Sequence, residues 1–414
     1  MTTSSTLARL QDLDAKDPLA ELRAHFEIPA GIIYLDGNSL GALPRRVAAH
    51  LETVIRREWG EGLIRSWTQT NWYELPRLVG ARIARLIGAL ADEVIAADST
   101  SANLFKLAAA ALQLRPGRNV LLTERGSFQT DVYILEGLAS IFRGNIVLRV
   151  VERSQILGAM DGDVALVVLT HVHYRTGEMF DMPEVTAAAH ARGALMLWDL
   201  SHSAGALEVD LNGAGADMAV GCGYKFLNGG PGAPAYLFAA RRHHEQLCQP
   251  LSGWAGHARP FEFEDRYAPA NGMARFLCGS PPILGLAALH EALSVFEGVD
   301  IADVRAKSSL MGDLFIELVR PDCARFGLSI GSPQDARIRG SHVSLLHPQG
   351  FAITRCLAAH GVLCDYREPD AMRFGFSPLY LRYEDIGHAV ETLRSVMTER
   401  RYERAEYRQR HAVT

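Results

Sequence analysis

The pattern of hydrophobic and polar positions along this 414-residue chain predicts two kinds of structure. Between about residues 100 and 240, short apolar runs alternate with helical segments, the pattern of a mainly parallel α/β sheet. Runs such as VALVVL at 164–169 are almost entirely apolar, which suits a sheet covered by helices on both faces. The predicted strands are 120–123, 146–151, 164–170, 194–198, 218–221 and 235–238.

Three helices are predicted in this part of the chain, at 102–114, 130–142 and 183–192. Gly193 follows the last of them, where a glycine commonly ends a helix. The polar residues 98–101 lie at the start of the first helix and supply capping side chains. The first turn of a helix leaves backbone N–H groups without partners, so this start is a candidate site for an anion.

After about residue 290 the pattern changes to that of a smaller α+β unit. Its predicted helices are 304–319, 351–360 and a segment from 383 onward, and its predicted strands are 342–347, 362–366 and 372–377. We therefore expect an α/β protein with a large domain at 50–290, whose mainly parallel mixed sheet is covered by helices. Residues 1–49 and 291–414 are expected to form the small domain.

Composition and charge exclude several classes of function. The chain is 48% hydrophobic and 21% charged, with a net charge of −5, which is typical of a globular protein without a nucleic-acid-binding surface. Its six cysteines form no CxxC pair, so no metal site is expected. The N-terminus lacks the apolar core of a signal peptide, and no apolar run is long enough to span a membrane. We expect a cytoplasmic protein with no membrane partner.

The residues that carry chemistry lie in the segment 199–238. A single lysine in a glycine-rich turn is most simply a solvated loop residue. Lys225, however, follows an apolar run and is preceded by Tyr224, while Asp199 comes just after another buried strand with His202 within a turn of it. This set suits pyridoxal 5′-phosphate. A carboxylate can pair with the pyridine nitrogen, a lysine can bind the aldehyde covalently, and an aromatic ring such as Phe128 can cover the cofactor ring. The helix start at 100–101 can hold the phosphate.

Several motifs make the chain resemble the kynureninases, which belong to the pyridoxal-phosphate enzymes of fold type I, over nearly its whole length. The motifs are YLDGNSLGALP (34–44), DSTSANLFK (98–106), FQTD (128–131), DLSHSAGA (199–206), GYKFLNGGPGAP (223–234), LSGWAGH (251–257), CGSPPI (278–283) and MRFGFSPLY (372–380). The combination of GNSLG with GYKFLNGGPG is specific. Tyr224 stands where related enzymes usually carry a histidine.

The resemblance implies a role for each matching residue. Lys225 binds the cofactor, and Lys225, Tyr224 and Asp199 are the expected catalytic residues. The other expected cofactor contacts are Thr100, Ser101, Phe128, Asp131, Thr170, His202, Trp254 and Ser280, of which the last two reach the neighbouring subunit of a homodimer with shared active sites. Arg373, Asn38 and Ser39 are expected to bind substrate. Two simpler alternatives remain open: Trp254 as a core or interface aromatic, and Asn38 with Ser39 as a turn between glycines.

The resemblance also implies the reaction, the hydrolysis of L-kynurenine to anthranilate and L-alanine in tryptophan degradation. Lys225 would move the substrate Cα proton, and Tyr224 would act as acid or relay. The segment 58–67, EWGEGLIRSW, contains no histidine, and Gly279 and Ser280 are small. Such a pocket gains nothing from a ring hydroxyl, so 3-hydroxykynurenine is expected to be the poorer substrate.

Four other functions are alternatives to this one. A cysteine desulfurase or selenocysteine lyase needs a cysteine on a flexible loop, whereas Cys364 lies in a predicted strand. An aminotransferase would require a keto acid, and a non-catalytic scaffold of the same fold would show no turnover. A nicotinamide-dependent dehydrogenase is disfavoured because no GxGxxG follows a strand.

Overall fold

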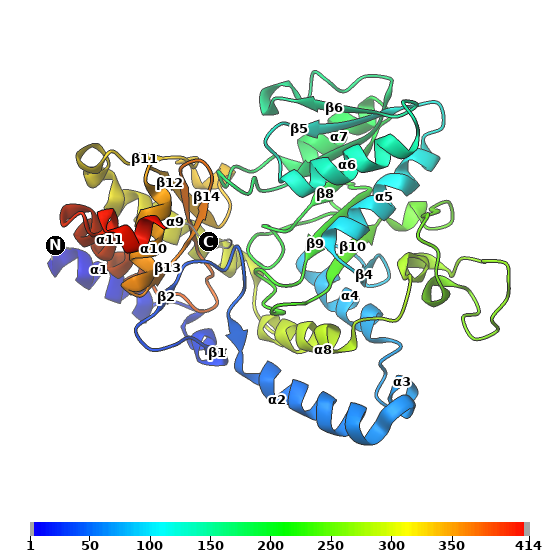
Figure 1. The fold of residues 1–414 in the computed structure, drawn as a ribbon, viewed down its shortest axis with the longest axis horizontal. Coiled ribbons are helices and arrows are strands. Elements are labelled where there is room, and N and C mark those ends of the chain that lie inside the picture. The colour runs from blue at the N-terminus through cyan, green and yellow to red at the C-terminus, as the bar shows by residue number, and fades with distance from the viewer. Residues whose placement is uncertain (1–3, 410–414) are drawn as a thin grey trace.

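The computed structural model describes residues 4–409 and contains two bodies of secondary structure, each built around its own sheet (Figure 1). The larger sheet has seven strands in the order β4-β10-β9-β8-β7-β5-β6. Only β10 runs antiparallel to its neighbours β4 and β9. The strands are β4 (Val94–Ala96), β5 (Val120–Glu124), β6 (Val147–Val151), β7 (Val164–Thr170), β8 (Leu195–Asp199), β9 (Met218–Cys222) and β10 (Ala235–Ala239).

Helices cover both faces of this sheet, which explains why its strands are apolar almost throughout. On one face lie α5 (Thr100–Leu114) and α6 (Gln129–Ile141); on the other lie α4 (Leu75–Leu86), α7 (Met182–Ala191) and α8 (Ile283–Ala292). Side chains alternate between the two apolar layers, as in β8, where Leu195 and Leu197 face α5 while Met196 and Trp198 face the opposite layer. The six predicted strands and three predicted helices of this region are confirmed, and only the short edge strand β4 was missed.

The smaller body has an antiparallel four-stranded sheet in the order β11-β12-β15-β14. Its strands are β11 (Ser329–Ile330), β12 (His342–Leu346), β14 (Asp365–Arg367) and β15 (Ala371–Gly375), and its helices are α9 (Ile301–Phe326), α10 (Gly350–Ala359) and α11 (Tyr383–Thr398). Together with the mixed, mostly parallel large sheet, this confirms the predicted fold class. Within residues 4–409, no helix is both long and apolar enough to cross a bilayer.

One predicted strand of the small body was wrong. The segment 362–366 is divided between β13 (Val362–Leu363), which pairs in parallel with β2 (Ile33–Tyr34), and β14, which pairs with β15. The division depends on a partner strand more than 300 residues away, which local periodicity does not reveal. The remaining α-helices and β-strands are α1 (Ser4–Ala15), β1 (Phe26–Glu27), β3 (Leu43–Pro44), α2 (Arg45–Thr53), α3 (Ser66–Gln69) and α12 (Ala405–Arg408).

The N-terminal segment contacts both bodies. The helix α1 packs on α11 of the small body, with Leu10 in the shared core, whereas α2 packs on α8 through Val47 and Ala292 (Figure 1). Joining residues 1–49 to 291–414, with a boundary near residue 50, remains our proposal for the domains. The N-terminal segment thus passes from one body to the other, and its loop at 36–41 lies between them.

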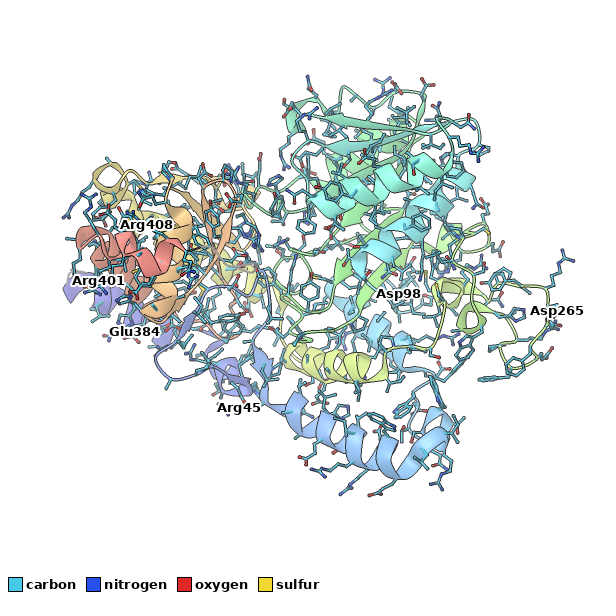
Figure 2. The ribbon with its side chains drawn as sticks, in the orientation of Figure 1. Arg45, Asp98, Asp265, Glu384, Arg401 and Arg408 are labelled. Carbon is cyan, nitrogen blue, oxygen red and sulfur yellow. The ribbon has the colours of Figure 1, made fainter. Side chains whose placement is uncertain are left out.

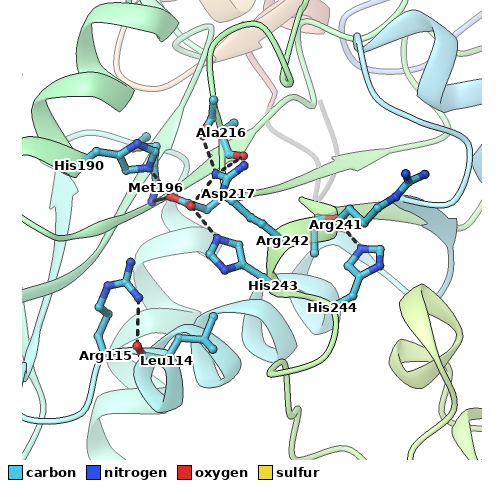
Figure 3. Close-up of polar contacts among 12 residues, drawn as sticks. Leu114, Arg115, His190, Met196, Ala216, Asp217, Arg241, Arg242, His243 and His244 are labelled. Atoms are coloured by element: carbon cyan, nitrogen blue, oxygen red, sulfur yellow. Dashed lines mark hydrogen bonds and ion pairs between the residues drawn. The ribbon is translucent and has the colours of Figure 1, made fainter.

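A buried carboxylate binds several neighbouring groups at one edge of the large sheet. This edge lies opposite the carboxyl ends of the parallel strands. Asp217 precedes β9 and accepts hydrogen bonds from His190 Nε2 at 2.7 Å, His243 Nε2 at 2.8 Å and Arg242 Nη2 at 2.7 Å, and from the backbone N–H of Met196 at 2.8 Å (Figure 3). Burial acts to raise the pKa of Asp217, but the hydrogen bonds from His190 and His243 hold it well below its usual value.

We expect Asp217→Asn to lower the free energy of unfolding by about 2 kcal/mol, less than for a fully buried ion pair because the partners are partly exposed. A carboxyl group whose pKa is depressed stabilises the fold above its unfolded-state pKa, near 3.8, and this contribution is lost as the pH falls below that value. The variant should therefore lose stability near neutral pH and show a flatter decline in acid. Denaturant unfolding at several pH values measures both, and equal stability of the two proteins at pH 7 would contradict the assignment.

Candidate active site

A cavity of about 540 Å³ lies at the carboxyl ends of β7 and β8 and beside the turn that follows β9. Ligands of α/β sheets commonly bind at this edge. Nine of the residues predicted for the cofactor line it: Thr100, Ser101, Phe128, Asp131, Thr170, Asp199, His202, Tyr224 and Lys225. The structure therefore brings together segments separated by up to 125 residues around one space.

Lys225 lies in the turn after β9, and its Nζ is 3.1 Å from Nε2 of the buried His202. Burial, and then the positive charge of Lys225, lower the pKa of His202, which keeps the imidazole neutral at physiological pH. The N-terminal segment of the chain holds this turn in place, because the backbone N–H of Gly41 donates to the carbonyl of Tyr224 at 2.7 Å. A Cβ atom at Gly41 would collide with the carbonyl of Lys225, which accounts for a glycine at this position.

Two buried carboxylates, Asp199 and Asp131, face the cavity, and within residues 4–409 neither forms an ion pair. Asp199 ends β8, and its Oδ1 accepts hydrogen bonds from the N–H and hydroxyl of Ser201 at 2.8 and 2.6 Å. Burial, and then the charge of Asp199, raise the pKa of Asp131 well above its usual value. Among the described residues, Asp131 Oδ2 and His202 Nδ1 are buried without a hydrogen-bond partner. A cationic N–H group in the cavity would give Asp131 Oδ2 a hydrogen-bond partner.

The start of α5 forms another wall of the cavity. The Ser99 hydroxyl accepts a hydrogen bond from the N–H of Ala102 at 3.2 Å, and Thr100 and Ser101 lie in the first turn, where N–H groups lack partners within the helix. Asp98 precedes the cap with a φ of 45° and is labelled in Figure 2. The fully buried Lys106 forms an ion pair with Asp98, so an anion at this helix start would meet a neutralised carboxylate.

Aromatic rings border the cavity on the side of α6. The Phe128 ring lies edge-on to Tyr174 with centroids 5.5 Å apart, and Lys225 Nζ is 6.0 Å from the centre of the Phe128 ring. Thr170, at the end of β7, shares a hydrogen bond of 3.0 Å with the hydroxyl of Ser127. The wall can thus hold a flat ring against an aromatic face.

These features fit pyridoxal 5′-phosphate. Asp199 can accept from a protonated pyridine nitrogen, the start of α5 can receive the phosphate, and Lys225 lies within the same space. The chain contains four lysines, 16, 106, 225 and 307, and only Lys225 lines the cavity. Among residues 4–409, no group of three or more His, Cys, Asp or Glu side chains is arranged to hold a metal ion.

Five predicted site residues lie outside this cavity. Arg373 lies in β15 of the small body and is fully buried, Asn38 is also buried, and Ser39 is half-buried beside Arg373. Trp254 is 37% exposed and lines a separate hollow of about 370 Å³ formed by the loop at 252–267, and Ser280 is exposed. Asp265, at the tip of that loop, projects away from the body (Figure 2).

The sequence prediction missed several residues that line the cavity, namely Asp98, Ser99, Thr130, Tyr174, Ser201, Pro282 and the segment 232–235. Ser201 had a readable signal, since a serine two residues after an aspartate often hydrogen-bonds back to its carboxylate. Tyr174 had none, because it follows β7 in a loop whose path depends on tertiary contacts.

Two family models match this chain. Residues 33–321 match the Aminotransferase class-V family, and residues 304–393 match the Kynureninase C-terminal domain. Kynureninases of Pseudomonas fluorescens and Burkholderia pseudomallei (strain K96243) are each 49% identical over 407 residues, covering 97% of this chain and 98% of theirs.

Solved structures of similar fold include cysteine desulfurases of Thermococcus onnurineus NA1 and Escherichia coli. Their TM-scores are 0.75 and 0.77 at 19% and 17% identity, and each match covers 92% of this chain and 98% of theirs. At this identity the likeness concerns the fold alone, which is that of the pyridoxal-phosphate enzymes. The full-length relatives decide the family: this chain belongs to the kynureninases, hydrolases that use pyridoxal 5′-phosphate to cleave a carbon–carbon bond.

Proposed function

We propose that this protein hydrolyses L-kynurenine to anthranilate and L-alanine, and that Lys225, Tyr224 and Asp199 carry the chemistry. The observation that supports this assignment is the convergence of these three residues on one cavity together with a helix start and an aromatic wall. Bound there, pyridoxal 5′-phosphate supplies an electron-accepting ring that stabilises negative charge at the substrate Cα.

Lys225 has two tasks in this proposal. It would bind the cofactor, and once the substrate amine had taken its place, its free Nζ would take the proton from the substrate Cα and deliver it to the carbon that Lys225 had occupied. Its neighbour His202 lies 3.1 Å away and is neutral, so it can accept a hydrogen bond from Nζ without adding a competing positive charge. Water adds its oxygen to the Cγ carbonyl, the Cβ–Cγ bond breaks, and the acyl part leaves as anthranilate.

Tyr224 is proposed as the acid that protonates Cβ of the remaining three-carbon fragment. Burial, and then the nearby Cys222 and Asp199, raise the pKa of Tyr224 above its usual value, so its hydroxyl keeps a proton at neutral pH. We expect Tyr224→Phe to retain the cofactor and its visible absorbance while lowering kcat roughly 100-fold. Stopped assays of anthranilate release measure the loss, and an unchanged kcat would remove Tyr224 from the chemistry.

Plain L-kynurenine is the proposed substrate, since no histidine lies in 58–67 and Gly279 and Ser280 offer little to a ring hydroxyl. The deciding experiment is incubation of the purified protein with L-kynurenine while anthranilate fluorescence is recorded. The same preparation is then tested with 3-hydroxykynurenine. Higher kcat/KM for L-kynurenine is the expected result, and a strong preference for the hydroxylated compound would reverse the choice of substrate.

We infer that the active site is completed by a second copy of the chain. Trp254 and Ser280 lie outside the cavity of their own chain, and the Phe261 ring lies 6.0 Å from that of Trp254 while remaining 67% exposed, as expected of a surface that a partner covers. Mixing Lys225→Ala with Trp254→Ala subunits should restore part of the activity, because one of the two sites in each mixed dimer receives intact residues from both chains. Mixtures no more active than their components would argue against shared sites.

A further inference from the structure

The small-domain sheet contains a buried ion pair that the proposed reaction does not yet use. Arg373 in β15 and Asp365 in β14 are directly opposite in the antiparallel register, and both side chains are buried. Arg373 Nε donates to Asp365 Oδ1 at 2.7 Å, and its Nη2 donates to Asp365 Oδ2. This two-point contact fixes the plane of the guanidinium group.

The other end of the guanidinium points toward the residues that lead to the cavity. Arg373 Nη1 donates to the carbonyl of Tyr174 at 2.6 Å, and Nη2 donates to the Ser39 hydroxyl at 3.0 Å. Tyr174 lines the cavity and contacts Phe128. Asp365 holds Nε and one N–H of Nη2. A substrate carboxylate that reached Arg373 from the cavity would therefore meet Nη1 and the second N–H of Nη2, in place of the contacts with Tyr174 and Ser39.

The charges of the cluster leave room for one more anion. Asp365 also contacts Arg367, whose Nη2 lies 2.8 Å from Oδ2, and it accepts a hydrogen bond from Ser39 Oγ at 2.5 Å. Burial, and then Asp365, raise the pKa of the nearby Asp36 to about 7, so Asp36 is largely uncharged below neutral pH. Below neutral pH, two guanidinium groups thus face one full carboxylate charge, and a substrate carboxylate would balance the second.

We propose that Asp365 is a positioning residue that holds Arg373 so that its outer end receives the α-carboxylate of the amino-acid substrate. The proposal rests on the proposed function, in which Arg373 binds that carboxylate. It is distinct from a second arrangement, in which Asp365 would occupy Arg373 as a competitor and its removal would improve binding. The two-point contact favours positioning, because a competitor would have to give up both of its buried hydrogen bonds to Arg373 before substrate could bind.

The experiment compares four variants of the cofactor-loaded enzyme, Asp365→Asn, Asp365→Ala, Arg373→Gln and the control Asp370→Asn. Asp370 precedes β15 and forms an ion pair with Arg175, and both side chains are about one-third exposed. Asp370→Asn therefore makes the same chemical change in a different ion pair. We expect Asp365→Asn to raise the KM for L-kynurenine by about tenfold or more, with kcat within about threefold of wild type. Asp370→Asn should leave both constants near wild type.

A second readout separates positioning from a general loss of structure. Formate is small enough to enter the space vacated in Asp365→Ala, and we expect it to lower the raised KM toward the wild-type value while the visible absorbance of the cofactor stays constant. A KM that is unchanged or lower in Asp365→Asn, or no response to formate, would overturn the proposal. If neither neutral variant folds, Asp365→Glu decides, since displacing the carboxylate by one methylene should still raise KM.

Arg373→Gln distinguishes a failure of the role proposed for Asp365 from a failure of the substrate site proposed at Arg373. If it raises KM strongly and the Asp365 variants do not, the role of Asp365 is wrong and the proposed function stands. If Arg373→Gln leaves KM unchanged, the substrate carboxylate binds elsewhere, and the assignment of Arg373 fails together with that of Asp365.

Discussion

Replacing Lys225 with alanine is expected to abolish turnover, with a loss on the order of 10,000-fold or more, because the residue is both the covalent anchor and the proton carrier. None of the other three lysines can take its place. Lys106 and Lys307 are buried in ion pairs with Asp98 and Asp17, and Lys16 pairs with Asp12 on the surface. Anthranilate release and the visible absorbance of the lysine-bound cofactor should therefore disappear together.

The control for this change is Lys16→Ala, which removes an exposed lysine immediately after α1 and should leave both signals intact. Borohydride reduction of the wild-type protein followed by peptide mapping adds a direct test, since the label should lie on the peptide that contains Lys225. A retained lysine–cofactor absorbance in Lys225→Ala, or a label on Lys106, would show that another residue is the anchor.

The large sheet could be predicted from sequence because its signals are local. Strands such as β7 are buried at every position and almost entirely apolar, and β5 and β7 are each followed by a helix of ordinary length, so pattern alone identified them. The residues around Lys225 were predicted for a related reason. Thr170, Asp199 and Lys225 lie at or just after the ends of predicted strands, whose carboxyl ends meet at one edge of the sheet, whereas Thr100 and Ser101 follow the missed strand β4 and were predicted from their helix start.

The contacts between distant segments could not be predicted in this way. The division of 362–366 between two sheets depends on the pairing of β13 with β2, and the fixing of the Lys225 turn depends on Gly41. The pairing of Arg373 with Asp365 likewise appears only once β14 and β15 are in register. The resemblance to a family suggested a substrate role for Arg373, but a role taken from a motif carries no information about what holds the side chain in place.

Asp199→Asn is expected to lower kcat/KM on the order of 1,000-fold while the protein remains folded. The carboxylate already accepts two hydrogen bonds from Ser201 through Oδ1, and the pyridine nitrogen of the cofactor needs an anionic acceptor to stay protonated. An amide can still accept from Ser201, so the local turn should survive, but it cannot stabilise a positive charge on the ring. Steady-state kinetics and cofactor absorbance measure the two effects separately.

The matched control is Asp217→Asn, which makes the same chemical change in a buried aspartate that precedes β9 at the opposite edge of the sheet. That variant should lose stability and keep its activity per bound cofactor, whereas Asp199→Asn should keep its stability and lose activity.

A further comparison, Asp131→Asn, tests which of the two neighbouring carboxylates pairs with the ring. Because burial and Asp199 already favour a proton on Asp131, its amide variant should be the milder one. If Asp131→Asn proved as damaging as Asp199→Asn, the two carboxylates would have to act as one unit that shares a proton.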